Sequence, residues 1–171
     1  EPPEKIVGIV ASFTPAKALH LFLKAPPKIA MEIPGVIFVM VGDGALRPQL
    51  EQQAEELGIT PTLRMLGWRR DIPEVLKALD VFLLTSLWEG LPGSLVEALL
   101  SGVPAVASCV DGIGEVVQEG RNGFLAPPGN TTAMATAVVR LLRDEPLRRA
   151  MGEQARCSVD DFSVQKMLKD Y

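Results

Sequence analysis

The stretch Val81–Ser101, VFLLTSLWEGLPGSLVEALLS, contains a whole strand–loop–helix unit. Its first residues are apolar or β-branched without alternation, a pattern typical of a strand buried on both faces. A loop rich in glycine and proline follows, and the apolar spacing over Leu95–Ser101 is that of a helix. A buried strand that leads through a short loop into a helix is the repeating unit of a parallel sheet. This stretch therefore predicts an α/β fold.

The same alternation of short apolar runs and helical segments extends along the chain. We predict strands over Ile6–Ala11, Val36–Val41, Thr62–Leu66, Val81–Thr85, Ala105–Ser108 and Phe124–Ala126. We predict helices over Lys17–Met31, Leu46–Leu57, Ile72–Ala78, Leu95–Ser101, Ile113–Glu119, Thr132–Arg143, Leu147–Ser158 and Ser163–Tyr171. Strict alternation predicts a single α/β domain: a doubly wound, Rossmann-like parallel sheet of about six strands with helices on both faces. Such sheets bind ligands outside the carboxyl ends of their strands.

The composition excludes several classes of protein. Of the 171 residues, 47% are hydrophobic, which suffices for one core, and the net charge of -4 argues against a protein that grips nucleic acid. No apolar run reaches the length of about 18 residues that suggests a membrane span. Cys109 and Cys157 lack metal-ligand spacing and a disulfide framework, so we expect a reducing compartment. His20, the single histidine, lies in an apolar helical stretch, where we expect a structural role.

Several residues mark predicted helix ends. Asp71 and Glu74 have the spacing of a capping box, with Pro73 in the first turn. Gly58 and Gly102 stand just past two helices, where a left-handed residue is favoured.

Glu89 and Glu97 stand eight positions apart, on either side of a tight loop. Glu97 with Ser94 matches a capping box, and Glu89 has the alternative of being a solvated loop carboxylate. The functional alternative is a binding role, and it starts from the loop. The loop glycines permit close approach of a ligand, and the N–H groups at the helix start suit a phosphate. Carboxylates beside a phosphate must accept hydrogen bonds from uncharged hydroxyls, and nucleotide sugars combine both groups.

Several ordered motifs resemble one known family. Glu89-Gly90-Leu91-Pro92 through Glu97-Ala98, followed by Gly102-Val103-Pro104, is similar to the acid-x7-acid motif of retaining glycosyltransferases of the GT-B fold, the group 1 or family-4 type. Four further segments match and extend the resemblance over nearly the whole chain: Gly42-Asp43-Gly44, Leu66-Gly67-Trp68, Asp111-Gly112-Ile113-Gly114-Glu115 and Gly120 through Gly129.

The resemblance implies a role for each matching residue. Glu89 would contact hydroxyls of the donor sugar, Glu97 would hold the ribose hydroxyls while still free to cap its helix, and Lys17 would neutralise the departing diphosphate. The alternative for Lys17 is a solvated lysine at a helix start without a binding role. The alternative for Trp68 is a side chain that only packs in the protein. The remaining residues expected at the nucleotide sugar are Gly42, Trp68, Arg69, Gly90, Leu91, Pro92, Gly93, Ser94 and Ser12.

The sequence also departs from the family pattern. The family usually carries an arginine where Ser12 stands, Thr14 is uncharged too, Ala18 replaces a common glycine, and Gly114 replaces the usual proline. One phosphate-binding cation is therefore missing, which weakens stabilisation of a leaving diphosphate. This leaves a second reading, a nucleotide-sugar-binding module that has lost catalysis. A third, a sugar-nucleotide epimerase of related fold, calls for a histidine or further acids, and His20 alone serves it poorly.

The resemblance finally sets expectations for the whole protein. It covers the donor-binding, carboxyl-terminal half of a two-domain enzyme, and the amino-terminal acceptor domain is absent from this sequence. We expect a UDP- or GDP-sugar donor, no cofactor, and, since no Asp-x-Asp occurs, no chelated metal. We expect the isolated domain to be inactive without its partner half. The full protein is expected in the cytoplasm, with peripheral association at the inner face of the membrane.

Overall fold

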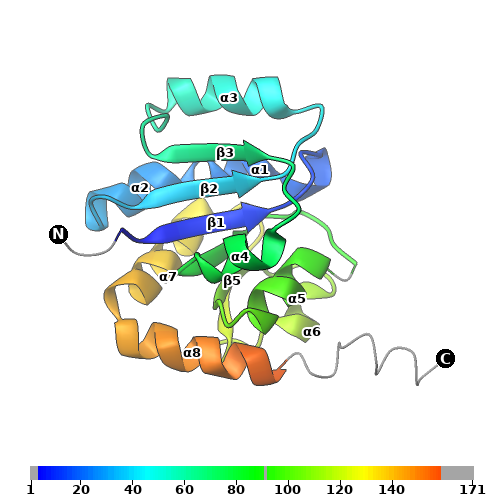
Figure 1. Ribbon diagram of the computed structural model, residues 1–171, viewed down its shortest axis with the longest axis vertical. Helices are drawn as coiled ribbons and strands as arrows, with labels where there is room; N and C mark the ends of the chain where they lie inside the picture. Colours follow the sequence, from blue (N-terminus) through cyan, green and yellow to red (C-terminus); the bar gives the residue numbers. More distant parts are fainter. Residues whose placement is uncertain (1–3, 91, 159–171) are drawn as a thin grey trace.

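The computed structural model describes residues 4–90 and 92–158 and contains a six-stranded sheet (Figure 1). All strand pairs are parallel, in the order β3-β2-β1-β4-β5-β6. The strands are β1 (Ile6–Val10), β2 (Ile37–Val41), β3 (Leu63–Gly67), β4 (Val81–Leu84), β5 (Ala105–Ser108) and β6 (Gly123–Ala126). The prediction of a doubly wound, Rossmann-like sheet of six parallel strands is confirmed, with each strand within one residue of its expected bounds.

Helices cover both faces of the sheet, as predicted. The helical elements are η1 (Pro15–Lys17), α1 (Leu19–Phe22), α2 (Ala25–Glu32), α3 (Arg47–Glu56), α4 (Ile72–Lys77), α5 (Gly93–Leu100), α6 (Ile113–Val116), α7 (Thr131–Arg143) and α8 (Glu145–Ser158). Helix α2 packs against α1 and α7, and α1 packs against α3; across the sheet, α5 packs against α4 and α8. The predicted helix Ser163–Tyr171 lies outside the described residues.

Strand β4 shows why these segments form a central sheet. It lies between β1 and β5, and all four of its side chains are fully buried. A strand covered on both faces has no solvent side, so its sequence is apolar throughout instead of alternating. Because the strands are parallel, their carboxyl ends and the loops that follow lie at one edge of the sheet (Figure 1).

The predicted helix Lys17–Met31 is wrong, because the segment forms η1, α1 and α2. Ala18 adopts a left-handed conformation with φ 45°, which ends η1 and interrupts the helical path. Pro26 and Pro27 then lie near the start of α2, where missing N–H groups are tolerated. The apolar spacing continues across both breaks, and periodicity alone therefore did not reveal them.

The predicted helix ends had mixed outcomes. Gly58 and Gly102 follow α3 and α5 with φ of +66° and +77°, which confirms both. The capping box of Asp71 and Glu74 is wrong, since the Asp71 side chain makes no capping hydrogen bond and instead pairs with Arg69. A guanidinium offers two charge-assisted donors to a carboxylate, and this competes with a single backbone N–H.

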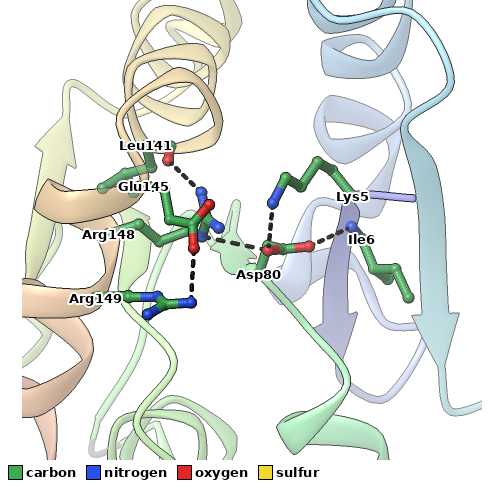
Figure 2. Close-up of polar contacts among 7 residues, drawn as sticks. All are labelled: Lys5, Ile6, Asp80, Leu141, Glu145, Arg148 and Arg149. Carbon is green, nitrogen blue, oxygen red and sulfur yellow. Dashed lines mark hydrogen bonds and ion pairs between the residues drawn. The ribbon is translucent and has the colours of Figure 1, made fainter. Parts of the chain in front are cut away.

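At the amino ends of the strands, an ionic cluster connects α8 to the starts of β1 and β4 (Figure 2). Asp80 accepts a hydrogen bond from the backbone N–H of Ile6 at 2.9 Å, and the Arg148 Nε lies 3.2 Å from its carboxylate. The Lys5 ammonium lies 3.6 Å from the same carboxylate, and Arg148 also donates to the Leu141 carbonyl at 3.1 Å. These contacts stabilise the fold at the edge away from the strand ends that carry the sequence motifs.

In residues 4–90 and 92–158, no helix combines the length and the apolar character needed to cross a membrane.

Candidate active site

A pocket of about 430 Å³ lies at the carboxyl ends of β1 and β2, beside the start of α5. A hollow of about 470 Å³ near α7 is larger but contains none of the predicted site residues, so size alone does not select a site. The structure gathers nine of the predicted residues around the first pocket: Ser12, Lys17, Gly42, Trp68, Arg69, Pro92, Gly93, Ser94 and Glu97. Glu89 and Gly90 do not line it, and Leu91 lies outside the described residues.

Glu89 is connected to the pocket through Lys17. The Lys17 Nζ donates to Glu89 Oε1 at 2.5 Å, and the Ser86 Oγ donates to the same oxygen at 2.6 Å. The Glu89 side chain is 8% exposed, so the alternative of a solvated loop carboxylate is wrong. The Lys17 side chain is 21% exposed and paired, which also excludes a freely solvated lysine.

The turn that carries Lys17 is fastened to the end of β4. Thr85 Oγ1 lies 3.2 Å from the carbonyl oxygen of Lys17 and 3.3 Å from that of Ala18, and donates between them. The backbone N–H of Leu87 donates to the Ala16 carbonyl at 2.9 Å. Lys17 and Glu89 are therefore held together through the backbone as well as through their charges.

The start of α5 differs from its prediction in a way that frees Glu97. The helix begins at Gly93, with Pro92 as the N-cap residue, and no side chain caps it. The capping box of Ser94 and Glu97 is therefore wrong, because Ser94 already lies inside the first turn. Glu97 is exposed and lines the pocket. The first-turn N–H groups of an α-helix have no partner within the helix, and Gly93 and Ser94 carry them here.

Gly42 lines the pocket and makes a close backbone contact with Ala11. Its φ is +124°, and a Cβ atom at this position would lie 1.9 Å from the carbonyl oxygen of Ala11. The loop after β2 therefore packs directly on the segment after β1. Only glycine fits this contact, which agrees with its place in the predicted glycine loop.

Trp68 and Arg69 stand at the rim of the pocket after β3. Trp68 is 77% exposed, so the alternative that it serves core packing is wrong. The Arg69 guanidinium donates two hydrogen bonds to Asp71, through Nε at 2.8 Å and through Nη2. This pairing raises the pKa of Arg69 and lowers that of Asp71.

Positive charge in the pocket is limited. Lys17 and Arg69 are each paired with a carboxylate, and Ser12 contributes only a hydroxyl. The first turn of α5 adds the partial positive charge of a helix N-terminus. The described residues contain no group of three or more His, Cys, Asp or Glu placed to hold a metal ion. Among the described residues, the pocket thus offers Lys17, Arg69 and a helix start to an anion.

Thr85 and Ser86 hold Lys17 and Glu89 in place, and neither was predicted as a site residue. Both follow an apolar strand and are fully buried, as core residues would be. The Ser-x-x-Glu spacing of Ser86 and Glu89 was the one available signal. The same spacing also marks capping boxes, so alone it does not point to a site.

The fold and the position of the pocket define a Rossmann-like α/β domain of the kind found in GT-B enzymes. Residues 1–157 match the family model described as Glycosyl transferases group 1. The chain therefore belongs to the group 1 glycosyltransferases, which confirms the resemblance to that family.

Two curated relatives are each 36% identical to this chain. One is N-acetyl-alpha-D-glucosaminyl L-malate synthase of Bacillus anthracis, for which the match covers 98% of this chain and 44% of the relative. The other is the Escherichia coli UDP-Gal:alpha-D-GlcNAc-diphosphoundecaprenol alpha-1,3-galactosyltransferase, with 96% and 46% covered. The chain thus spans about half the length of the curated relatives it matches.

Solved structures agree with the fold. HepE of Anabaena, in complex with UDP-glucose, is 30% identical with a TM-score of 0.90, over 98% of this chain and 47% of that one. TarM of S. aureus gives a TM-score of 0.93 at 24% identity, over 97% of this chain and 34% of that one, and supports the fold alone.

Proposed function

We propose that this chain is the donor-binding part of a retaining glycosyltransferase and that its pocket takes a nucleotide sugar. The observation that carries the proposal is the meeting, at the strand ends, of an exposed Glu97, the Lys17–Glu89 pair and the start of α5. The two carboxylates can accept hydrogen bonds from hydroxyl groups, and the N–H groups and the ammonium beside them can donate to phosphates. A nucleotide sugar carries both hydroxyl and phosphate groups. The complex of HepE with UDP-glucose and the E. coli relative's UDP-Gal donor favour a UDP-sugar.

Each residue has a distinct task in this proposal. Glu97 accepts hydrogen bonds from the ribose hydroxyls, and the N–H groups of Gly93 and Ser94 donate to the diphosphate. Trp68 and Arg69 flank the base, and Gly42 lets the ligand approach the backbone. Lys17 donates to the leaving diphosphate, and Glu89 accepts from a hydroxyl of the sugar.

The proposed transfer proceeds with retention at the anomeric carbon. The bond between that carbon and the diphosphate oxygen breaks, and the bonding electrons leave with the diphosphate. The acceptor hydroxyl forms its bond on the same face, and its proton passes to the departing phosphate oxygen. Lys17 and the helix start stabilise the charge that develops on the leaving group. Residues beyond this chain would bind the acceptor, and we therefore expect no sugar transfer by the chain alone.

Ser12 favours one alternative, a binding module without catalysis. With a hydroxyl in place of a cation, the leaving diphosphate receives less stabilisation. Both readings require nucleotide-sugar binding and differ in whether the full-length protein transfers the sugar.

A calorimetric titration of the chain with UDP, GDP and ADP tests the shared requirement. We expect selective binding of one nucleotide, with a Kd of about 0.1–1 mM. Glu97→Ala should weaken it about tenfold or more, because hydrogen bonds to a charged group contribute about 1.5–3 kcal/mol. Glu153→Ala, an exposed glutamate on α8, is the matched control. Binding that is equally strong in both variants would contradict the proposed role of Glu97.

A further inference from the structure

Two consecutive buried hydroxyl residues, Thr85 and Ser86, follow the last residue of β4, and neither has any exposed surface. Buried hydroxyls need hydrogen-bond partners, because their desolvation is otherwise uncompensated. In both cases the partner belongs to a charged residue of the candidate site. Thr85 donates toward the backbone carbonyl of Lys17, and Ser86 donates to the carboxylate of Glu89.

The two oxygens of the Glu89 carboxylate have different surroundings. Oε1 receives both the Lys17 ammonium at 2.5 Å and the Ser86 hydroxyl at 2.6 Å. Oε2 receives no hydrogen bond from residues 4–90 or 92–158. An ionised carboxylate has about four lone-pair positions, so Oε2 retains capacity for a ligand donor.

Lys17 and Ser86 differ in how they respond to a ligand. A diphosphate competes for the Lys17 ammonium, because it carries more negative charge than a single carboxylate. The Ser86 hydroxyl is buried and has no competing ligand group. When Lys17 turns toward phosphate, Ser86 is the contact that still fixes Oε1.

We propose that Ser86 is a positioning residue for sugar recognition, which fixes Glu89 so that Oε2 faces a hydroxyl of the donor sugar. The inference rests on the proposed function and deepens it, because it separates sugar recognition from diphosphate binding. Ser86 contributes to the extra affinity that the sugar adds to the nucleotide. It contributes nothing to the affinity for the nucleotide itself.

The test compares UDP with UDP-glucose, UDP-galactose and UDP-N-acetylglucosamine, by calorimetry on the purified chain. In the wild type, we expect at least one UDP-sugar to bind more tightly than UDP. Ser86→Ala should remove about fivefold or more of that difference and leave UDP affinity within about twofold, since one hydrogen bond to a charged group is lost. Ser86→Thr, which keeps the hydroxyl, should retain the difference.

Ser108→Ala is the matched control. Ser108 is a fully buried serine at the end of the neighbouring strand β5, and its hydroxyl has no partner among the described residues. Its removal should leave both affinities unchanged. If Ser86→Ala only lowers thermal stability and keeps the sugar's contribution, the positioning role is wrong.

Two further results distinguish a failure of the Ser86 role from a failure of the proposed function. Binding of UDP with no gain from any of the three sugars would overturn the positioning role and leave the nucleotide site standing. Binding of no nucleotide by a folded wild-type chain would overturn the proposed function and this inference with it.

Discussion

The ammonium of Lys17 lies 2.5 Å from the carboxylate of Glu89, although 72 positions separate the two residues. The pair joins the turn after β1 to the loop after β4, two neighbouring strands of the sheet. Its charges offset each other at the position where the proposed ligand would bring a diphosphate. We propose that the state of this pair governs how strongly the pocket attracts phosphate.

Glu89→Gln should strengthen the binding of UDP. The substitution keeps the size of the side chain but removes the negative charge that faces Lys17. We expect affinity for UDP to rise about fivefold, or about 1 kcal/mol, and the contribution of the sugar to fall. Calorimetry with UDP and UDP-glucose measures both effects. Uridine, which lacks phosphate, is the control ligand, and an equal rise in its affinity would contradict the electrostatic explanation.

Ser12→Arg should also strengthen UDP binding, since it adds a cation to a pocket in which the described residues place two, Lys17 and Arg69. A charge-assisted hydrogen bond at this partly open position should raise affinity about fivefold. Ser12→Gln has similar length without charge and should have little effect. Unchanged affinity in Ser12→Arg is the result expected of a module that has lost its catalytic function, and it would count against an active donor site.

Ala18→Gly should be nearly neutral for stability, because opposing effects cancel. Relief of the left-handed φ of 45° gains about 1–2 kcal/mol. Loss of the buried methyl group and the added freedom of the unfolded chain cost about 1–2 kcal/mol together. Ala135→Gly, buried inside the regular helix α7, should lose about 1.5 kcal/mol, because no strain is relieved there. Urea unfolding compares them, and equal losses would show that Ala18 is unstrained.

Arg148→Ala should lower the free energy of unfolding by about 3 kcal/mol, because it leaves the partly buried Asp80 with less compensation. Arg149→Ala removes an exposed i,i+4 pair with Glu145 and should cost about 0.5 kcal/mol or less. Neither change should alter nucleotide affinity, since the cluster lies at the other edge of the sheet from the pocket. A similar loss of stability in both variants would contradict the importance assigned to the Asp80 cluster.

His20 should make the protein less stable as the pH falls through the range just below 6.5. His20 is exposed, but desolvation by its surroundings, and next the positive charge of Lys24, lower its pKa from the ordinary value of 6.5. Between the folded pKa and 6.5, the unfolded chain binds more protons, so stability rises with pH in that window. NMR of the single histidine ring measures the pKa directly. His20→Gln should remove this part of the pH dependence, and a folded pKa at or above 6.5 would contradict the prediction.

The sequence predicted the sheet well because burial on both faces leaves a strong signal. Val81–Leu84 is apolar throughout, and Gly58 and Gly102 occupy left-handed positions that favour glycine. The prediction of one continuous helix across Ala18 was wrong, because an alanine in a left-handed turn does not interrupt the apolar pattern typical of a helix. The predicted start of α5 was also wrong. Serine is a residue type that favours the N-cap position, but the helix already begins at Gly93, before Ser94.

Only those residues of the candidate site that belong to sequence motifs could be predicted. Lys17, Glu97 and the glycine of the loop after β2 were all expected there, and the structure places them around one pocket. The contacts of Thr85 and Ser86 depend on side-chain directions at a strand end. No periodicity or composition encodes those directions, and these residues emerged only from the geometry.

An NMR titration of the amide-labelled chain with UDP-glucose tests directly whether the strand-end pocket binds a nucleotide sugar. We expect the largest shifts at the amides of Gly42, Gly93 and Ser94, smaller ones beside Lys17, and none in the hollow of α7 around Thr136. Shifts concentrated in that hollow, or no shift at any millimolar concentration in a folded chain, would contradict the assignment of the strand-end pocket as a nucleotide-sugar site.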